Sequence, residues 1–132
     1  MKRKLIMSVA VLLMLVAIVF PIAEARGSMR NASGSCGMNH VGKSVTFSGH
    51  TSSSEDEDVI RVTIILQEKR DGTWYGISSR TKTEQNSDFA GTSKDYTVSG
   101  GHYYRVYASH YARTGDVVSS SSSSSEAIWI PE

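Results

Sequence analysis

Hydrophobic and polar residues alternate along much of the chain beyond residue 30, with the period of two that is typical of β-strands. The clearest run is Ile60–Lys69, where four aliphatic residues share one parity and polar residues take most of the other. Such alternation with β-branched residues favours a strand with one face on a core. Asp71-Gly72 follows and Thr73–Lys82 is again extended, so the sequence predicts an antiparallel hairpin with a type I′ turn.

Shorter runs of the same kind predict further strands, with Gly-containing reversals at Val41-Gly42 and at Ser99–Gly101. These runs are Ser33–His40, Lys43–His50, Ser93–Val98, His102–Tyr111 and Ala127–Ile130. The small, acidic segment Thr51–Asp58 is predicted to be a loop. The serine run Ser119–Ser125 has two interpretations, a flexible linker or a polar edge strand leading into the last strand, and the sequence does not choose between them.

Six or seven short strands separated by turns, without helical periodicity, predict an all-β fold, an immunoglobulin-like antiparallel β-sandwich. In the run His102–Tyr111, Tyr104 and Val106 have the spacing of the tyrosine corner of such folds. In that motif the tyrosine hydroxyl bonds to the backbone a few residues upstream.

The N-terminus has the three parts of a secretory signal. Met1–Lys4 is basic, Leu5–Phe20 is apolar except for one serine, and Ala23-Glu24-Ala25 places small residues at a cleavage site. We therefore expect a signal-peptide helix over residues 1–25 and a single β-sandwich domain over residues 26–132. The apolar run is shorter than the roughly 20 residues of a spanning helix. The chain should thus meet the membrane only transiently and be secreted, extracellular or associated with the cell envelope.

The net charge and the cysteine content limit the classes of binding partner and the disulfide bonds that the chain can have. Removing the signal removes three of the 14 basic and one of the 13 acidic residues, so the net charge falls from +1 to −1. No basic stripe is visible along the sequence, and we expect no nucleic-acid partner. Cys36 is the only cysteine, which excludes an intrachain disulfide. We expect it to be buried as a small hydrophobe, the alternative being a thiol available for an intermolecular bridge.

Several segments together resemble an uncharacterised family of small secreted β-sandwich proteins of Gram-positive bacteria, a domain of unknown function. The segments are Arg26-Gly27-Ser28, the strand 60–69, the turn Asp71–Trp74 and the strand Gly101–Val106. The resemblance implies a β-sandwich and export, and it brings no catalytic residues.

The sequence contains no assembled catalytic or metal-binding motif. The nearest histidines in sequence, His102 and His110, are eight residues apart, whereas zinc motifs place histidines three to five apart. We expect all four histidines to be isolated surface or strand-end residues. Glu55–Asp58 lacks the spacing of a Ca²⁺ loop, and no Gly-x-Ser-x-Gly elbow is present. We predict no catalytic residues, metal or cofactor; a hydrolase with a scattered site stays an alternative.

Aromatic residues are the remaining candidates for function. Tyr103, Tyr107 and Tyr111 share the outward parity of their strand, and Trp74 begins the second strand of the predicted hairpin. Flat aromatic rings on a sheet face can stack on sugar rings or on a partner protein, although they also pack against one another across strands.

Export, a compact β domain and the absence of an assembled catalytic motif predict a secreted, non-catalytic module with a binding or accessory role at the cell envelope, whose partner is an extracellular protein or a cell-wall glycan. The alternative is a secreted effector, such as a small toxin, a bacteriocin-like protein or an inhibitor. Its contacts would come from exposed loops at Thr51–Asp58 and Arg113–Val118.

Overall fold

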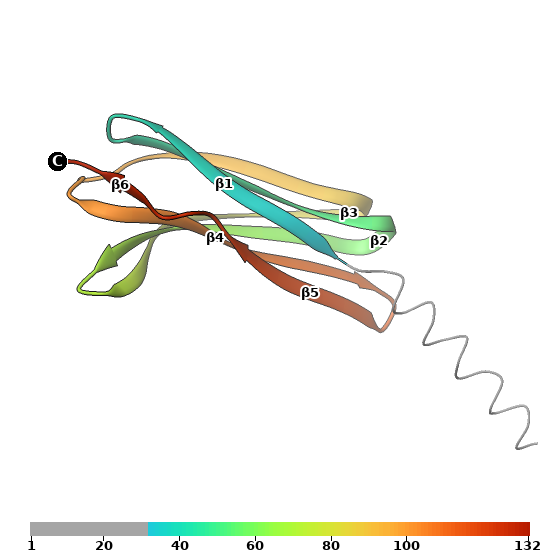
Figure 1. The fold of residues 1–132 in the computed structure, drawn as a ribbon. Helices are drawn as coiled ribbons and strands as arrows, with labels where there is room; N and C mark the ends of the chain where they lie inside the picture. Colours follow the sequence, from blue (N-terminus) through green and yellow to red (C-terminus); the bar gives the residue numbers. More distant parts are fainter. Residues whose placement is uncertain (1–31) are drawn as a thin grey trace, which may run out of the picture. The chain divides into compact units, whose positions relative to one another are not determined.

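The structure, a computed structural model, describes residues 32–132, which form six antiparallel β-strands and no helix (Figure 1). The strands are β1 (Ser33–Val41), β2 (Ser44–Arg70), β3 (Thr73–Thr97), β4 (His102–Thr114), β5 (Val117–Ser124) and β6 (Ile128–Ile130). The prediction of an all-β antiparallel fold with six or seven strands is confirmed. The predicted signal-peptide helix, its cleavage after Ala25 and the domain boundary at residue 26 lie outside the described residues.

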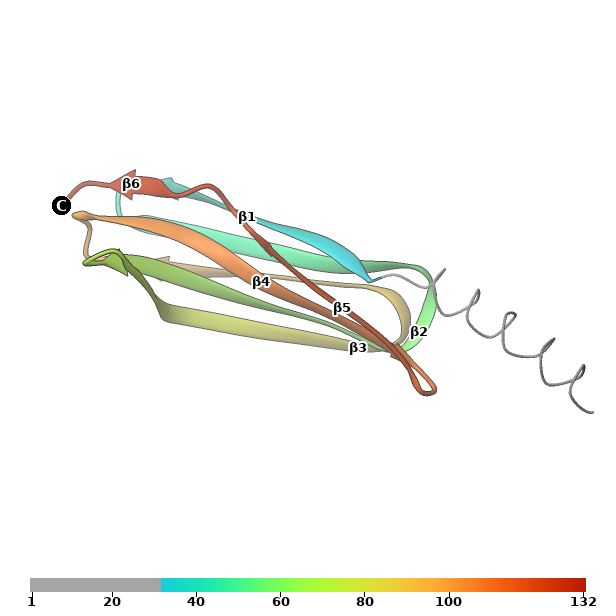
Figure 2. The same ribbon diagram turned by 60° about the horizontal axis from the view of Figure 1, so that its bottom comes forward.

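One long bent hairpin organises the fold. β2 and β3 pair from Ser44–Thr97 at one end to Thr73–Arg70 at the other, with a register shift between Ser52 and Glu57. The first half of β2 also pairs with β1, and the second half pairs with β4. The hairpin bends back at the register shift, so its halves lie in two facing layers (Figure 2). We call the layer with β1 the first sheet and the layer with β4, β5 and β6 the second sheet.

The buried face of β2 changes parity at the bend. Odd-numbered residues such as Val45 and Phe47 are buried before it, whereas even-numbered residues such as Ile60 and Val62 are buried after it. A regular strand keeps one parity, so the irregular segment between them must turn the strand over. Both halves can therefore point their aliphatic residues into the same core.

The prediction of a loop at Thr51–Asp58 is wrong, because the whole segment lies within β2. Its small, acidic composition is typical of loops, yet the chain stays extended through the bend. Glu57 is buried there and accepts hydrogen bonds from Ser53 Oγ at 2.7 Å and from Thr114 Oγ1 at 2.9 Å. Hydrogen bonding of this kind makes a buried carboxylate tolerable.

The core lies between the two sheets and is built mainly from aliphatic residues. Its buried members are Ala32, Val45, Phe47, Ile60, Val62, Ile64, Leu66, Ala90, Val98, Tyr104, Val106, Ala108, Ala112 and Ile130. Every second residue of β4 from Tyr104 to Ala112 is buried, as the predicted alternation requires. The opposite parity of β4 therefore faces outward from the second sheet.

The predicted turns are present, although the strands on either side of one of them do not pair with each other. Asp71 and Gly72 both have positive φ, at 51° and 80°, which confirms the turn predicted between β2 and β3. The Gly-rich reversal at Ser99–Gly101 does not close a hairpin. Ser93–Thr97 pairs with β2 in the first sheet, so the reversal carries the chain across to β4 in the second.

The serine run is an edge strand, which settles the choice that the sequence left open. β5 pairs with the second half of β4, and its last serines lie beside β1. Ala32 N donates to Ser119 Oγ at 2.8 Å, and Ser121 Oγ donates to Ala32 O at 3.2 Å. Alternate serines thus hold the beginning of the described chain against β5 and help to close this side of the sandwich.

The opposite side of the sandwich is bordered by β3, which pairs only with β2 among the described strands. Arg80 donates to the carbonyl of Ser93 at 2.8 Å, and Lys94 donates to the carbonyl of Ser79 at 3.2 Å. These two cations reach between the halves of the bent strand. Charged side chains on an edge strand also discourage pairing with another chain.

The side chain of Tyr104 has the contacts of a tyrosine corner. It is fully buried, and its hydroxyl accepts a hydrogen bond of 3.1 Å from the backbone N–H of Gly100, four residues upstream. We predict that Tyr104→Phe lowers the free energy of unfolding by about 1 kcal/mol, because the buried N–H loses its partner. Chemical denaturation measures the change. Tyr103→Phe, on the outward parity, is the matched control, and equal stability of the two variants would contradict this role.

Candidate binding face

The outer surface of the second sheet gathers aromatic and basic side chains from four strands. These side chains occupy the positions that point away from the core, and the strand register makes them neighbours. We call this surface the aromatic face; it consists of Trp74, Tyr103, Tyr107, Tyr111 and Trp129 with Arg61, Lys69, Arg105 and Arg113. From Tyr103 to Tyr111 it extends over eight residues of β4, or about 27 Å at the rise of a strand.

The structure brings all four predicted binding residues to this face, but they are less exposed than expected. Tyr103 is 47% exposed, whereas Trp74, Tyr107 and Tyr111 are half-buried. Tyr103 packs against Trp129 of β6, with their ring centroids 5.2 Å apart in an edge-to-face arrangement. Sequence reasoning missed Trp129, whose short strand gave too little alternation to assign a face.

Arginine side chains hold two of the half-buried rings. The guanidinium of Arg105 lies 4.3 Å from the ring centroid of Trp74, and its Nε donates to Gln67 Oε1 at 2.7 Å. The guanidinium of Arg61 lies 4.9 Å from the ring of Tyr111, and its Nε donates to Thr83 Oγ1 at 3.2 Å. The aromatic residues thus pack across strands, which is the alternative to ligand binding that the sequence analysis named. Their rings also orient two arginine side chains.

A hollow of about 410 Å³ lies between Tyr107 and Tyr111. Its remaining lining comes from Arg61, Thr63, Ser109, His110 and Ser120–Ser122. Tyrosine rings flank it, hydroxyl groups lie along it and one guanidinium borders it. This combination offers apolar ring surface, hydrogen-bonding groups and positive charge to one ligand.

The positive charge of the aromatic face is not visible in the linear sequence. Arg61 and Lys69 lie on β2, and Arg105 and Arg113 lie on the neighbouring β4. No exposed acidic residue occurs among the outward positions that the registers assign to the second sheet in residues 32–132, since Glu57, which shares their parity, is buried. The linear sequence therefore did not indicate that these four residues share one face. Strand pairing brings together basic residues that are 36 to 52 positions apart in sequence, as for Lys69 with Arg105 and Arg61 with Arg113.

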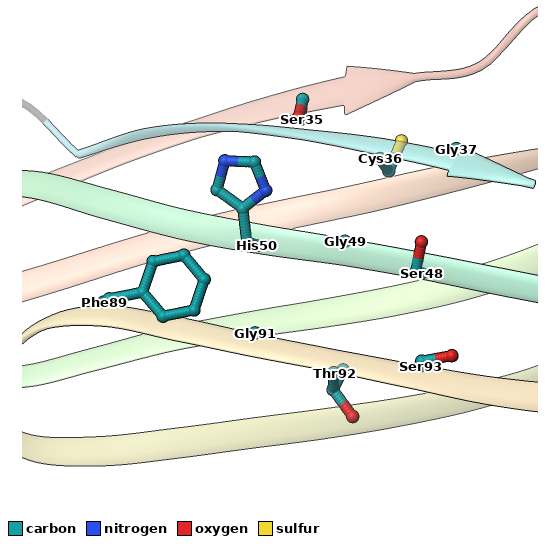
Figure 3. Close-up of a pocket in the computed structure, with 10 residues that line it drawn as sticks. All are labelled: Ser35, Cys36, Gly37, Ser48, Gly49, His50, Phe89, Gly91, Thr92 and Ser93. Carbon is teal, nitrogen blue, oxygen red and sulfur yellow. The ribbon is translucent and has the colours of Figure 1, made fainter.

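A second hollow, of about 650 Å³, lies on the first sheet (Figure 3). Its floor is made of small residues, including Gly37, Ser48 and Gly91, and the stacked rings of His50 and Phe89 border one end with centroids 5.5 Å apart. A Cβ added to Gly37 would meet no atom within 4 Å. The hollow exists because side chains are missing from the sheet surface, and no Lys, Arg, Asp or Glu lines it.

His110 is buried rather than at the surface, so the expectation of four surface or strand-end histidines is wrong. It is 1% exposed, with Nδ1 2.8 Å from Thr51 Oγ1 and Nε2 2.8 Å from Ser123 Oγ. Thr51 Oγ1 donates to the carbonyl of Arg61, which assigns Nδ1 of His110 as the donor to Thr51 and Nε2 as an acceptor. Burial lowers the pKa of His110, and His50 lowers it further.

Cys36 is half-buried rather than fully buried, and it belongs to the same polar cluster. Its Sγ lies 3.4 Å from Ser123 Oγ and donates to the carbonyl of Val106 at 3.7 Å. The neighbouring Gly34 must remain small, since a Cβ there would lie 2.5 Å from His110 Nδ1 and would overlap the carbonyl of His50. The cluster fixes how β1, β4 and β5 approach one another.

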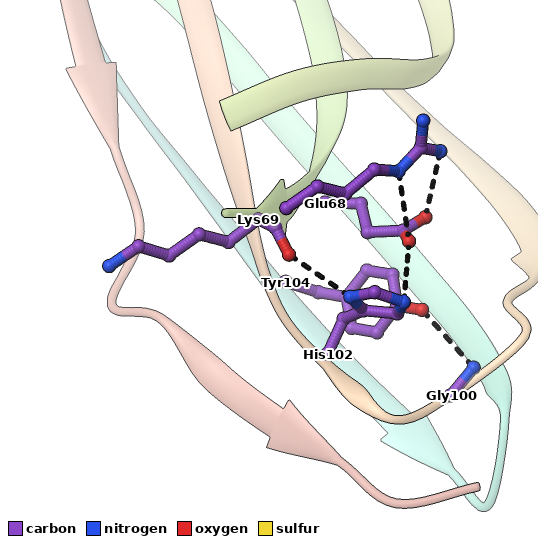
Figure 4. A network of polar contacts seen from close by, with 6 residues as sticks. Glu68, Lys69, Gly100, His102 and Tyr104 are labelled. Atoms are coloured by element: carbon purple, nitrogen blue, oxygen red, sulfur yellow. Dashed lines mark hydrogen bonds and ion pairs between the residues drawn. The ribbon is translucent and has the colours of Figure 1, made fainter. Parts of the chain in front are cut away.

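A second polar network lies near the β2–β3 turn (Figure 4). The buried carboxylate of Glu68 accepts from Arg70 Nε at 3.2 Å and lies 3.1 Å from Nε2 of His102. Nδ1 of His102 lies 3.1 Å from the carbonyl of Lys69. The hydrogen bond with Glu68 raises the pKa of Arg70, which keeps the guanidinium charged. Both ring nitrogens of His102 lie close to oxygen atoms, so this histidine completes a structural polar network around the Glu68 carboxylate.

Residues 32–132 contain neither a metal-binding cluster nor a membrane-spanning helix. No group of three or more His, Cys, Asp or Glu side chains is placed to hold a metal ion in this part of the chain. Within the same residues, no helix has the length and apolar character needed to cross a membrane.

Comparison with known proteins assigns no family. No family model matches the chain, and no curated protein matches it. The solution structure of R. palustris CsgH is similar at 12% sequence identity, covering 70% of this chain and 90% of that chain, with a TM-score of 0.39. A similarity at this level supports no functional argument. The resemblance to a secreted Gram-positive family stays a prediction.

The buried His110 predicts a dependence of stability on pH. Its folded pKa lies below the usual 6.5, so both states are neutral above pH 6.5 and stability is then greatest. As the pH falls below 6.5, the unfolded chain takes up the proton first, and the free energy of unfolding declines by at most about 1.4 kcal/mol per pH unit. The decline ends below the folded pKa.

Urea denaturation between pH 8 and pH 5 measures this slope. We expect His110→Asn to flatten it, whereas His40→Asn, on the outer part of β1, should leave it unchanged. An identical slope in the protein and in the His110 variant would show that another group causes the decline.

Proposed function

We propose that this protein is a secreted, non-catalytic binding module that acts at the cell envelope through the aromatic face. The observation that carries the proposal is the gathering of five aromatic and four basic residues on one side of the second sheet. Tryptophan, tyrosine and arginine are the residues that most often dominate binding energy at protein surfaces. Their combination on a rigid sheet favours recognition over catalysis.

The side chains of the aromatic face are already ordered by contacts within the chain. Arg105 is held by Trp74 and Gln67, and Arg61 is held by Tyr111 and Thr83. A ligand that meets ordered side chains loses less conformational entropy in the complex. The secretory signal predicted at residues 1–25 supports a partner outside the cytoplasm.

The geometry of Ser123 and His110 supports a non-catalytic role. The two residues have the spacing of a nucleophile and its base, with Oγ and Nε2 2.8 Å apart. However, Ser123 faces Cys36 and β1, and it lines neither of the two hollows described above. A substrate in either hollow would not meet the hydroxyl, and the group next to Nδ1 is a threonine instead of a carboxylate.

The effector alternative is less well supported, because one of the two loops on which it relied is part of a strand. Thr51–Asp58 is part of β2. Arg113–Val118 contains the end of β4, a turn at Gly115-Asp116 and the start of β5. The first segment therefore presents no loop, and the second presents a two-residue hairpin turn followed by the exposed Val117 and Val118.

The proposal predicts that aromatic-face variants bind cell envelopes less well. Tyr107→Ala and Tyr111→Ala should each reduce retention of the purified protein on envelope fractions of the producing organism by about fivefold or more, the usual effect of truncating an important interface aromatic. Tyr96→Ala is the matched control, since Tyr96 is exposed but pairs with Val45 in the first sheet. Retention is measured by co-sedimentation, and circular dichroism checks folding. Equal retention of all variants, or none by the unaltered protein, would reject the proposal.

A further inference from the structure

We infer that the ligand of the aromatic face is an anionic glycan whose sugars carry carboxylate groups. This inference rests on the proposed function and assigns the ligand class of the same surface. It combines three properties of the face, namely one sign of charge, preordered guanidinium groups and a hydroxyl-rich sheet surface flanked by tyrosines.

The charge of the aromatic face is opposite to that of such a ligand. The face carries Arg61, Lys69, Arg105 and Arg113 and no exposed acidic residue at its outward positions within residues 32–132. The chain without residues 1–25 has a net charge of −1, so its acidic residues lie elsewhere. A surface with one sign of charge attracts the opposite sign and raises the rate of encounter.

The two central arginines retain donors for a carboxylate. Each uses its Nε in a hydrogen bond to a neighbouring side chain, Gln67 for Arg105 and Thr83 for Arg61. A guanidinium has five N–H groups, so the four on its terminal nitrogens can still form the paired hydrogen bonds that suit a carboxylate. The rings beneath them fix their positions, and lysine could not give the same two-point contact.

The hydroxyl groups of the face indicate a sugar rather than a nucleic acid or a peptide. Eight serine and threonine residues point outward on the second sheet: Thr63, Ser79, Thr81, Thr83, Ser109, Ser120, Ser122 and Ser124. Many hydroxyl donors and acceptors match a ligand that is itself rich in hydroxyl groups. Single-stranded nucleic acids bind chiefly by stacking bases on open rings, yet guanidinium groups lie over Trp74 and Tyr111.

The hollow between Tyr107 and Tyr111 is the best place for a sugar ring. The two tyrosines flank it, Ser109 and Thr63 offer hydroxyls, and Arg61 borders it. The face continues for about 27 Å along β4 towards Arg105 and Tyr103, at about 3.4 Å per residue. This length exceeds that of a single sugar and suits a polymer.

The test uses polygalacturonate, a glycan with a carboxylate on each sugar, and measures its affinity for the full chain by isothermal titration calorimetry. Dextran supplies sugar rings without charge, polyglutamate supplies carboxylates without sugar rings, and oligodeoxythymidylate supplies a single-stranded nucleic acid. We expect polygalacturonate to bind at least tenfold more tightly than each of the three. Equal or tighter binding of dextran, polyglutamate or the oligonucleotide would overturn the inference.

Charge-matched variants locate the binding surface. Replacing Arg61 and Arg105 together by glutamine should weaken polygalacturonate binding at least tenfold, whereas replacing Lys43 and Lys82 by glutamine should change it less than twofold. The variant Arg61→Lys/Arg105→Lys keeps the charge without the planar fork, and we expect an intermediate loss. Equal losses in the two glutamine variants would overturn the inference. If the variant Arg61→Gln/Arg105→Gln fails to fold, the variant Arg61→Lys/Arg105→Lys decides the question. Full affinity of that variant for polygalacturonate would overturn the inference.

The outcome is separable from that of the proposed function. Retention on envelope fractions without any binding of polygalacturonate would overturn the ligand class and leave the binding module standing. Absence of both retention and polygalacturonate binding would reject both.

Discussion

The change of parity within β2 is the constraint on which the rest of the structure depends. Side chains of a strand alternate between its two faces, so a hairpin of this length could bury only one parity unless it turned over. The bulged segment after Ser52 makes that turn and allows both halves to face one core. The aromatic face is the other consequence, because the same turn directs Arg61 and Lys69 outward beside the outward residues of β4.

The polar side chains buried in the sandwich all have hydrogen-bond partners, and a small β domain can therefore tolerate their burial. No buried side-chain nitrogen or oxygen in residues 32–132 lacks a hydrogen-bond partner. His110 joins β2 to β5 through Thr51 and Ser123, while Glu68 joins the β2–β3 turn region to His102. These networks sit at sites where strands meet, and each fixes a strand position that apolar contacts alone would define less sharply.

Local patterns predicted the local structure well. The hairpin around Asp71-Gly72, the burial of alternate residues in β4 and the outward tyrosines all follow from period-two alternation and turn chemistry. The bend at Thr51–Asp58 was missed because an acidic segment is typical of loops. The burial of His110 and the gathering of basic residues on the aromatic face were missed because both depend on pairing between strands that are distant in sequence. Outward parity could have indicated Arg61 and Arg105, but only the register places them on neighbouring strands.

The most direct test of this account is a thiol-accessibility measurement along β2 in a Cys36→Ser background. Single cysteines replace Val45 and Thr46 before the bend and Val62 and Thr63 after it, and their reaction with a water-soluble thiol reagent is timed under native conditions. The account predicts fast reaction at positions 46 and 63 and protection at positions 45 and 62, so the protected parity changes from odd to even. Protection at 45 and 63 with fast reaction at 46 and 62 would mean one parity throughout, and it would contradict both the two-sheet fold and the placement of the aromatic face.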